Sequence, residues 1–249
     1  MARLNGILKI EGTIQDLTFY KTQDGHLVRS KGGVSGARIA SDPAFARTRE
    51  NGAEFGSSAS AGKLLRDALR NMVTTASDGR VTARITQLMT QLKNMDDSSA
   101  RGERSVALGI AKPEGKNLLK NFNFNDKSAL GSILFKPYVV DSATGVIGIN
   151  DFKPGKDVKA VIGATHISIK GGFAVIDFET GESELQLTNV ENLSIKGSGA
   201  SITLTPDAVP VLSGTKFFLL QLEYFQEING VQYSLKNGAY NALAIIDVV

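Results

Sequence analysis

The side chains through which this chain could do chemistry are few, and their spacing argues against catalysis. His26 and His166 lie 140 residues apart, each in a strand-like segment, and cysteine is absent. No nucleophile elbow, zinc-protease, P-loop or dinucleotide-binding motif occurs. A carboxylate pair such as Glu179 with Glu182 or Glu184 could do acid–base work, but carboxylates beside a turn are ordinarily just solvated. The sequence therefore predicts a protein that is not an enzyme and uses no cofactor.

A second group of polar side chains raises the question of an ion site. Asn121, Asn123, Asn125 and Asp126 place four oxygen donors within six residues, and Ca²⁺ prefers oxygen ligands. The spacing lacks the glycine and the terminal glutamate of an EF-hand loop. Phenylalanines alternate with the asparagines, which a strand with one polar face would also produce. The pattern fits either a calcium site or a strand with one polar face, and we assign no metal.

The distribution of arginine is the strongest pointer to a contact surface. All eleven arginines lie at or before Arg104. Residues 1–120 carry 19 Lys+Arg against 12 Asp+Glu, whereas residues 121–249 carry 9 against 13. Arginine is well suited to bidentate contacts with carboxylates and phosphates, so we expect the N-terminal region to bind an acidic partner. The predicted subunit-interface residues are Arg29, Arg38, Arg47, Arg49, Arg66 and Arg70.

Three other interpretations compete with this one. Acidic residues are interspersed among the arginines, so they could simply be the mixed charge of solvated helices. Binding of nucleic acid is the rival function, although only Phe45 and Phe55 interleave residues 38–100 as aromatic neighbours. Binding of carbohydrate or a surface protein at loop tips is the third, but tryptophan is absent and only five tyrosines could stack on a sugar.

The elements that position these residues predict an α+β fold in three parts. Residues 1–40 form an N-terminal β-hairpin arm, with strands at 7–11, 17–20 and 26–29 and a hairpin signal at Asp24-Gly25. Residues 41–97 form a helical segment of two to three helices, at about 41–55, 59–76 and 81–95. A polar loop at 96–104 marks the predicted domain boundary.

Residues 105–249 are predicted to be an antiparallel β-sandwich of the immunoglobulin or fibronectin type. The expected strands are 105–111, 133–140, 166–169, 173–178, 184–187, 201–204, 217–226, 231–235 and 242–248. Turn signals separate several of them, among them Gly171-Gly172, Thr180-Gly181 and Asn229-Gly230. The last of these is the most secure hairpin in the chain.

Composition places the chain among globular proteins, with 42% apolar and 21% charged residues. No signal peptide is recognised and no apolar run reaches the length of a membrane helix. We expect synthesis in the cytoplasm, no membrane association, and a final location that could be a virion or an extracellular particle.

The first 70 residues resemble a family of uncharacterised proteins from Flavobacteria and their Bacteroidota relatives. The resemblance is carried by Asn5–Lys9, Gly12–Ile14, Leu17–Lys21, Asp24-Gly25, Arg29–Val34, Asp42–Phe45, Arg47–Asn51, Glu54–Gly56 and Ala61–Arg66. It implies no activity and assigns no functional residue. The order of strand-rich arm, helices and all-β body is also similar in architecture to phage virion or tail-like structural subunits.

Two further features favour contact with another copy of the chain. The small residues of the stretch 52–62 would weaken an isolated helix and would suit close packing against a neighbour. The edges of the N-terminal strands carry little that would prevent pairing with a second chain. The favoured hypothesis is therefore a structural subunit that assembles with itself through its Arg-rich N-terminal region.

Overall fold

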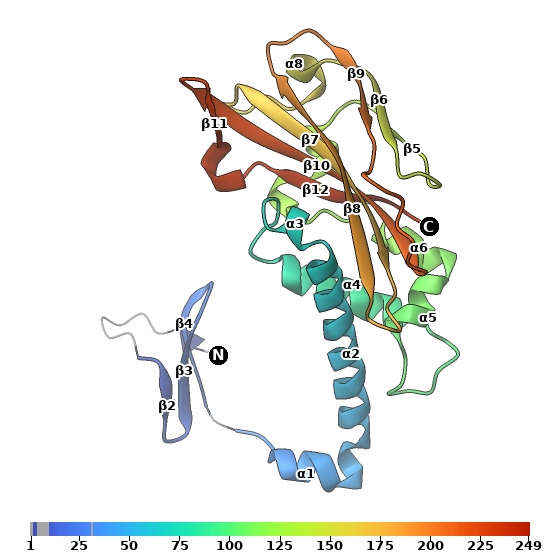
Figure 1. The fold of residues 1–249 in the computed structure, drawn as a ribbon. Coiled ribbons are helices and arrows are strands. Elements are labelled where there is room, and N and C mark those ends of the chain that lie inside the picture. Colours follow the sequence, from blue (N-terminus) through green and yellow to red (C-terminus); the bar gives the residue numbers. More distant parts are fainter. Residues whose placement is uncertain (1, 4–9, 31) are drawn as a thin grey trace. The chain divides into compact units, whose positions relative to one another are not determined.

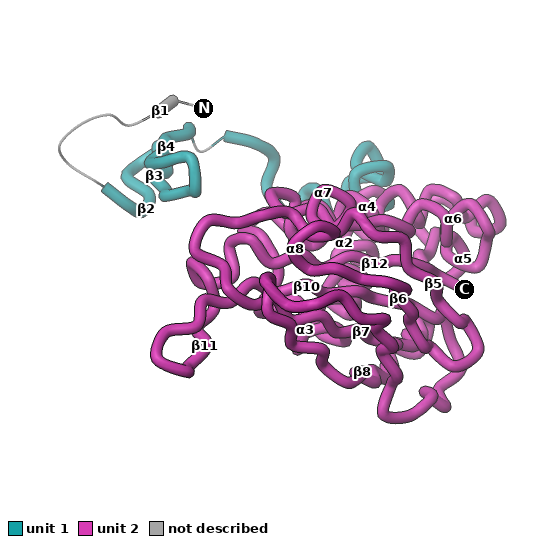
Figure 2. The backbone as a smooth tube through the Cα atoms, turned by 90° about the horizontal axis from the view of Figure 1, so that it is seen from above, with its two compact units in different colours: residues 1–50 teal, residues 51–249 magenta. Residues whose placement is uncertain are grey.

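The computed structural model describes residues 2–3, 10–30 and 32–249, and it separates the chain into two compact units. Unit 1 comprises residues 1–50 and unit 2 comprises residues 51–249 (Figure 2). The division falls inside the long helix α2 (Ala46–Ala68). Helices and antiparallel strands occur together throughout, so the predicted α+β class is confirmed.

Unit 1 contains a four-stranded antiparallel sheet followed by short helices. The strands are β1 (Ala2–Arg3), β2 (Gly12–Ile14), β3 (Leu17–Thr22) and β4 (Gly25–Ser30), in the order β1-β4-β3-β2. Helix α1 (Gly36–Ser41) is capped by the Ser35 side chain, and the 3₁₀ helix η1 (Pro43–Phe45) by Asp42. The predicted strand at 7–11 falls largely outside the described residues.

The register of this sheet brings four apolar side chains together on one face. Ile14 lies opposite Leu17, and Phe19 lies opposite Val28, so these four side chains share one face. Lys21 and His26 follow on that face, whereas Thr18, Tyr20 and Leu27 lie on the other. None of the side chains that the structure describes between residues 10 and 50 is buried. The unit has regular secondary structure without a closed apolar core in its described part.

Unit 2 is built on a twisted five-stranded antiparallel sheet with the long strand β10 (Thr215–Ile228) at its centre (Figure 1). On one side β10 pairs with β7 (His166–Ile176), which pairs in turn with β8 (Ser183–Ser194). On the other side it pairs with both β11 (Val231–Ser234) and β12 (Ala242–Val248). A smaller sheet has the order β5 (Val139–Val140), β6 (Ile147–Phe152), β9 (Ala200–Leu204).

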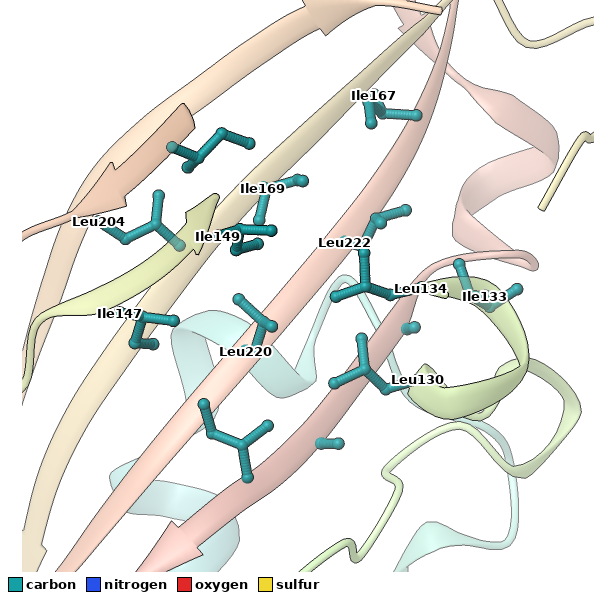
Figure 3. Close-up of a cluster of buried hydrophobic side chains, with 14 of the residues drawn as sticks. Leu130, Ile133, Leu134, Ile147, Ile149, Ile167, Ile169, Leu204, Leu220 and Leu222 are labelled. Atoms are coloured by element: carbon teal, nitrogen blue, oxygen red, sulfur yellow. The ribbon is translucent and has the colours of Figure 1, made fainter. Parts of the chain in front are cut away.

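Both faces of the main sheet are covered, which explains why β10 is apolar on every residue from 217 to 220. Phe217 and Leu219 pack among helices, whereas Phe218, Leu220 and Leu222 pack toward the smaller sheet (Figure 3). The helical face comprises the C-terminal part of α2, α3 (Arg70–Val73), α4 (Val81–Lys93), α5 (Val106–Ala111) and α6 (Pro113–Leu119). Helices α7 (Leu130–Ile133) and α8 (Pro154–Asp157) and the 3₁₀ turns η2 (Asp126–Ser128) and η3 (Leu235–Gly238) complete the unit.

Several predictions about these elements were wrong. Residues 105–111 are the helix α5, whose first turn is capped by Ser105, and 133–140 contains only the end of α7 and the short β5. The predicted boundary loop at 96–104 lies inside unit 2. The body consists of the small sheet, the main sheet and the helices, in that order.

Gly171-Gly172 was also assigned wrongly, since both residues lie in the middle of β7. A Cβ atom on Gly171 would approach the Ile147 side chain to 2.8 Å, and one on Gly172 would approach the Met72 sulfur to 2.7 Å. Because both faces of the strand are covered, these positions need the absence of a side chain rather than a turn.

Candidate assembly surface

Three of the six predicted interface arginines pair with carboxylates one helical turn away. Arg38 Nε lies 3.0 Å from Asp42, and Arg70 Nη2 lies 2.8 Å from Asp67. Arg47 Nη1 lies 3.4 Å from Glu50. All three guanidinium groups are on exposed side chains, where an ion pair contributes little and exchanges readily with another partner.

The other three arginines have unlike surroundings. Arg49 Nη1 donates to the carbonyl oxygens of Ile39 (2.7 Å) and Asp42 (3.0 Å), so it ties the first turn of α2 to α1 and η1 within unit 1. The Arg29 guanidinium lies 5.6 Å from the centre of the Tyr20 ring. Arg66 is half-buried, and its Nη1 has no hydrogen-bond partner in the described part of the chain. Four of the six residues thus belong to unit 1, and Arg66 and Arg70 belong to unit 2.

The opposed charges of the two halves of the sequence do not coincide with the two units. Residues 1–50 contain 8 Lys+Arg and 5 Asp+Glu, a net charge of +3, and residues 51–249 contain 20 of each. Part of the expected attraction acts inside unit 2, where Lys120 Nζ lies 2.6 Å from Asp247 and Arg84 contacts Asp126 at 3.9 Å. Charge complementarity between copies is therefore weaker than the sequence division implies.

The apolar face of the unit 1 sheet is a stronger candidate for a contact surface. Ile14 and Leu17, at the tip of the β2–β3 hairpin, are 53% and 45% exposed. Phe19 and Val28 continue the same face and are only half-buried. Covering an exposed apolar face of this kind removes apolar surface from water and stabilises the sheet.

The edges of the two sheets are protected to different degrees. Residues 121–124 run along the outer edge of β12, where Asn121 and Phe124 donate to the carbonyls of Ile245 and Leu243. Residues 205–207 bond to the middle of β8 in the same way. In unit 1, β2 pairs only with β3, and no described segment covers its other edge. Described segments thus cover long edges of the body, whereas none of the described strands pairs with this edge.

A buried carboxylate fixes helix α2 at the start of unit 2. Glu54 is 2% exposed and accepts from Arg104 Nε (2.8 Å) and Nη2 (3.1 Å), from the Gly102 amide (2.8 Å) and from Lys93. Hydrogen bonds from Arg104 and Lys93 lower the pKa of Glu54 to about 2. These two cations are therefore engaged within the chain. Sequence reasoning missed Glu54, whose only signal was its position among small residues.

The polar loop that follows is also a folded structure. Asp96 is buried and accepts from the amides of Ser98, Ser99 and Ser105, at 3.0, 3.1 and 3.0 Å. Hydrogen bonds from Ser99 lower the pKa of the Asp96 carboxyl far below its ordinary range. The loop thus connects α4 to α5 with a fixed geometry.

The candidate calcium ligands serve mainly to hold the backbone. Asn123 Oδ1 accepts from the Leu130 amide at 2.7 Å, and Asn125 Oδ1 accepts from the Lys127 amide at 3.2 Å. Asn125 Nδ2 also donates to the Asn241 carbonyl. The described residues contain no group of three or more acidic, histidine or cysteine side chains placed to hold a metal ion.

The candidate catalytic residues are divided between the two units. His26 belongs to unit 1, whereas His166, in unit 2, lies 3.6 Å from Glu227. Glu184 accepts from the amides of Val211 and Leu212 and so fastens the loop beside β8.

Among the described residues, no helix has both the length and the apolar character that crossing a bilayer requires.

Comparison with known proteins gives this surface no precedent. Models of protein families, curated protein sequences and solved structures returned no match to the chain. The resemblance to the Bacteroidota family and to phage structural subunits stays a prediction.

Proposed function

We propose that this chain is a non-enzymatic structural subunit that assembles with copies of itself through its N-terminal unit. The observation that carries the proposal is the sheet of unit 1, which has an apolar face and no buried side chain in its described residues. Fixing such a segment in one conformation costs backbone entropy that only buried surface can offset. A second copy supplies that surface.

Two features favour a copy of the same chain as the partner. The open edge of β2 can extend the sheet into a neighbour through main-chain hydrogen bonds, which require no particular partner sequence. The net charge of +3 on residues 1–50 also disfavours two bare N-terminal units in contact and favours docking onto a less basic surface of the adjacent copy. A head-to-tail contact of that kind closes into rings or continues as a tube or filament, as in a virion or tail-like particle.

The contribution of the arginines is part of this proposal. Arg29, Arg38, Arg47 and Arg70 have exposed or easily exchanged contacts, so they can reach acidic groups of a neighbour. Nucleic-acid binding by the same arginines is the alternative, and its signature is an affinity that falls linearly with the logarithm of salt concentration. The immunoglobulin- or fibronectin-like character of the body stays a prediction.

The proposal is tested by changing one face of β3 at a time. Phe19→Glu places a charge on the apolar face, and Thr18→Glu, on the opposite face of the same strand, is its matched control. Light scattering after size exclusion, with negative-stain microscopy, should show the wild type and T18E as multimers. F19E should run as a 26.5 kDa monomer.

A chain that lacks residues 1–40 should likewise be a folded monomer, with its thermal transition retained. A monomeric wild type at high protein concentration would refute self-assembly. Multimers that persist in F19E would refute the role of this face.

A further inference from the structure

A pocket beside α7 has no part in the proposed assembly surface. It encloses about 360 Å³ between the segment that covers β12 and the residues that lead into β5. Leu130 and Leu134 line it, and both belong to the buried cluster of apolar side chains drawn in Figure 3. A volume of this size lies at the small end of the range that ligand sites occupy, roughly 300 to 1,000 Å³.

The polar groups of the pocket are uncharged and partly free. The Asn121 side chain and the Tyr138 hydroxyl line the pocket and make no hydrogen bond within the described part of the chain. Ser132 donates its hydroxyl proton to the Ala129 carbonyl at 2.8 Å, which leaves its oxygen able to accept. No charged side chain is among the lining residues.

Two neighbouring features keep these groups neutral and oriented. Burial, followed by the charge of Asp247, raises the pKa of Tyr138, so its hydroxyl keeps its proton to a higher pH than an exposed tyrosine does. Asp247 itself is paired with Lys120 at 2.6 Å. Asn121 has a left-handed backbone (φ 64°), and its backbone N–H donates a hydrogen bond to the Ile245 carbonyl oxygen at 2.8 Å, so its side chain projects from a fixed position.

We infer that this pocket binds a neutral, hydroxyl-bearing ligand of about monosaccharide size. An aliphatic wall with one tyrosine ring suits the C–H face of a sugar, and an amide with two hydroxyl groups suits its hydroxyls. A charged ligand would find no counter-charge in the lining. The inference is independent of self-assembly, because none of the lining residues belongs to unit 1.

Gly131 provides a direct way to close the pocket. It lines the cavity, and a Cβ atom built on it meets nothing within 4 Å. Gly131→Leu should therefore fill the pocket without disturbing the core, and Gly131→Ala should leave most of it open. Tyr138→Phe removes one hydrogen bond and keeps the ring, which should weaken binding about fivefold.

The probes are glucose, galactose, mannose and N-acetylglucosamine, titrated into the full-length chain and observed by saturation-transfer NMR and calorimetry. Saturable binding of at least one sugar, weakened in Y138F and abolished in G131L, supports the inference. G131L and G131A should both retain the wild-type melting temperature. Failure of all four sugars to bind, binding that survives in G131L, or equally tight binding of glucuronate would each overturn it.

Discussion

Neutralising Glu54 should destabilise unit 2 far more than neutralising an exposed acid on the same helix. Glu54→Gln preserves the side-chain volume but removes the negative charge between Lys93 and Arg104. The Lys93 side chain is only 9% exposed, whereas that of Arg104 is 26% exposed and can turn toward water. The substitution thus leaves one nearly buried cation without a counter-charge.

The expected loss follows from that geometry. Removing one partner of a buried ion pair costs about 3–5 kcal/mol. Glutamine can still accept one hydrogen bond, and Arg104 can regain solvent, so we expect about 2–3 kcal/mol here. For a unit of this size each kcal/mol shifts the melting temperature by about 2–4 °C, which gives a decrease of roughly 5–10 °C.

Differential scanning calorimetry at pH 7 measures this change. Asp67→Asn, which removes an exposed i,i+3 pair from the same helix, is the control and should shift the midpoint by less than about 2 °C. In the E54Q background, Lys93→Met should recover part of the loss, because it removes the unpaired charge. If E54Q melts within 2 °C of D67N, the cluster does not stabilise the unit.

The same carboxyl gives a pH dependence with a defined sign. Its folded-state pKa of about 2 is below the ordinary value near 4.5, so its contribution is fully present above about pH 4.5. The contribution is lost as the pH falls through 2. The gap between the melting temperatures of wild type and E54Q should stay constant at neutral pH and narrow from about pH 4.5 downward. A gap that stays constant to pH 3 would contradict the assignment.

Two other substitutions test contacts between distant segments. Gly109→Ala puts a Cβ atom 1.9 Å from the Leu92 carbonyl oxygen, so α5 must move away from α4. We expect the melting temperature to fall by several degrees. Gly131→Ala is the control and should leave the melting temperature unchanged. The Arg84 guanidinium pairs with Asp78 at 2.6 Å and donates to two carbonyl oxygens of residues 121–124, the segment along β12. Arg84→Met removes these contacts and should lower the free energy of unfolding in urea by about 2–3 kcal/mol. An unchanged unfolding midpoint would show that this contact is dispensable.

The parts of the fold that were predicted correctly are those fixed by neighbouring residues. Asn229-Gly230 forms the expected two-residue hairpin, with positive φ at both positions and Ile228 opposite Val231. Helix α4 begins at Val81, close to the predicted start, because its apolar residues recur at helical spacing. Local chemistry alone is enough for such elements.

The parts that were missed depend on contacts across long sequence separations. The run 105–111 is short and apolar, so its periodicity cannot distinguish helix from strand. Its identity depends on Gly109, which lets α5 touch the backbone of α4. Glu54 gains its role from Arg104, fifty residues later. The sequence indicates only that the N-terminal strands have unprotected edges. Which side chains share a face of unit 1 depends on the register between strands, and strand pairing sets that register.

The segment 121–124, which lies along β12, also affects how readily unit 2 aggregates. Amyloid-like growth starts where a strand can recruit another through free amide and carbonyl groups. While residues 121–124 remain in place, Leu243 and Ile245 have no such groups to offer on that side. A protease cut within that segment should expose these groups to pairing with a strand of another molecule, so resistance to aggregation on storage should depend on the segment being intact.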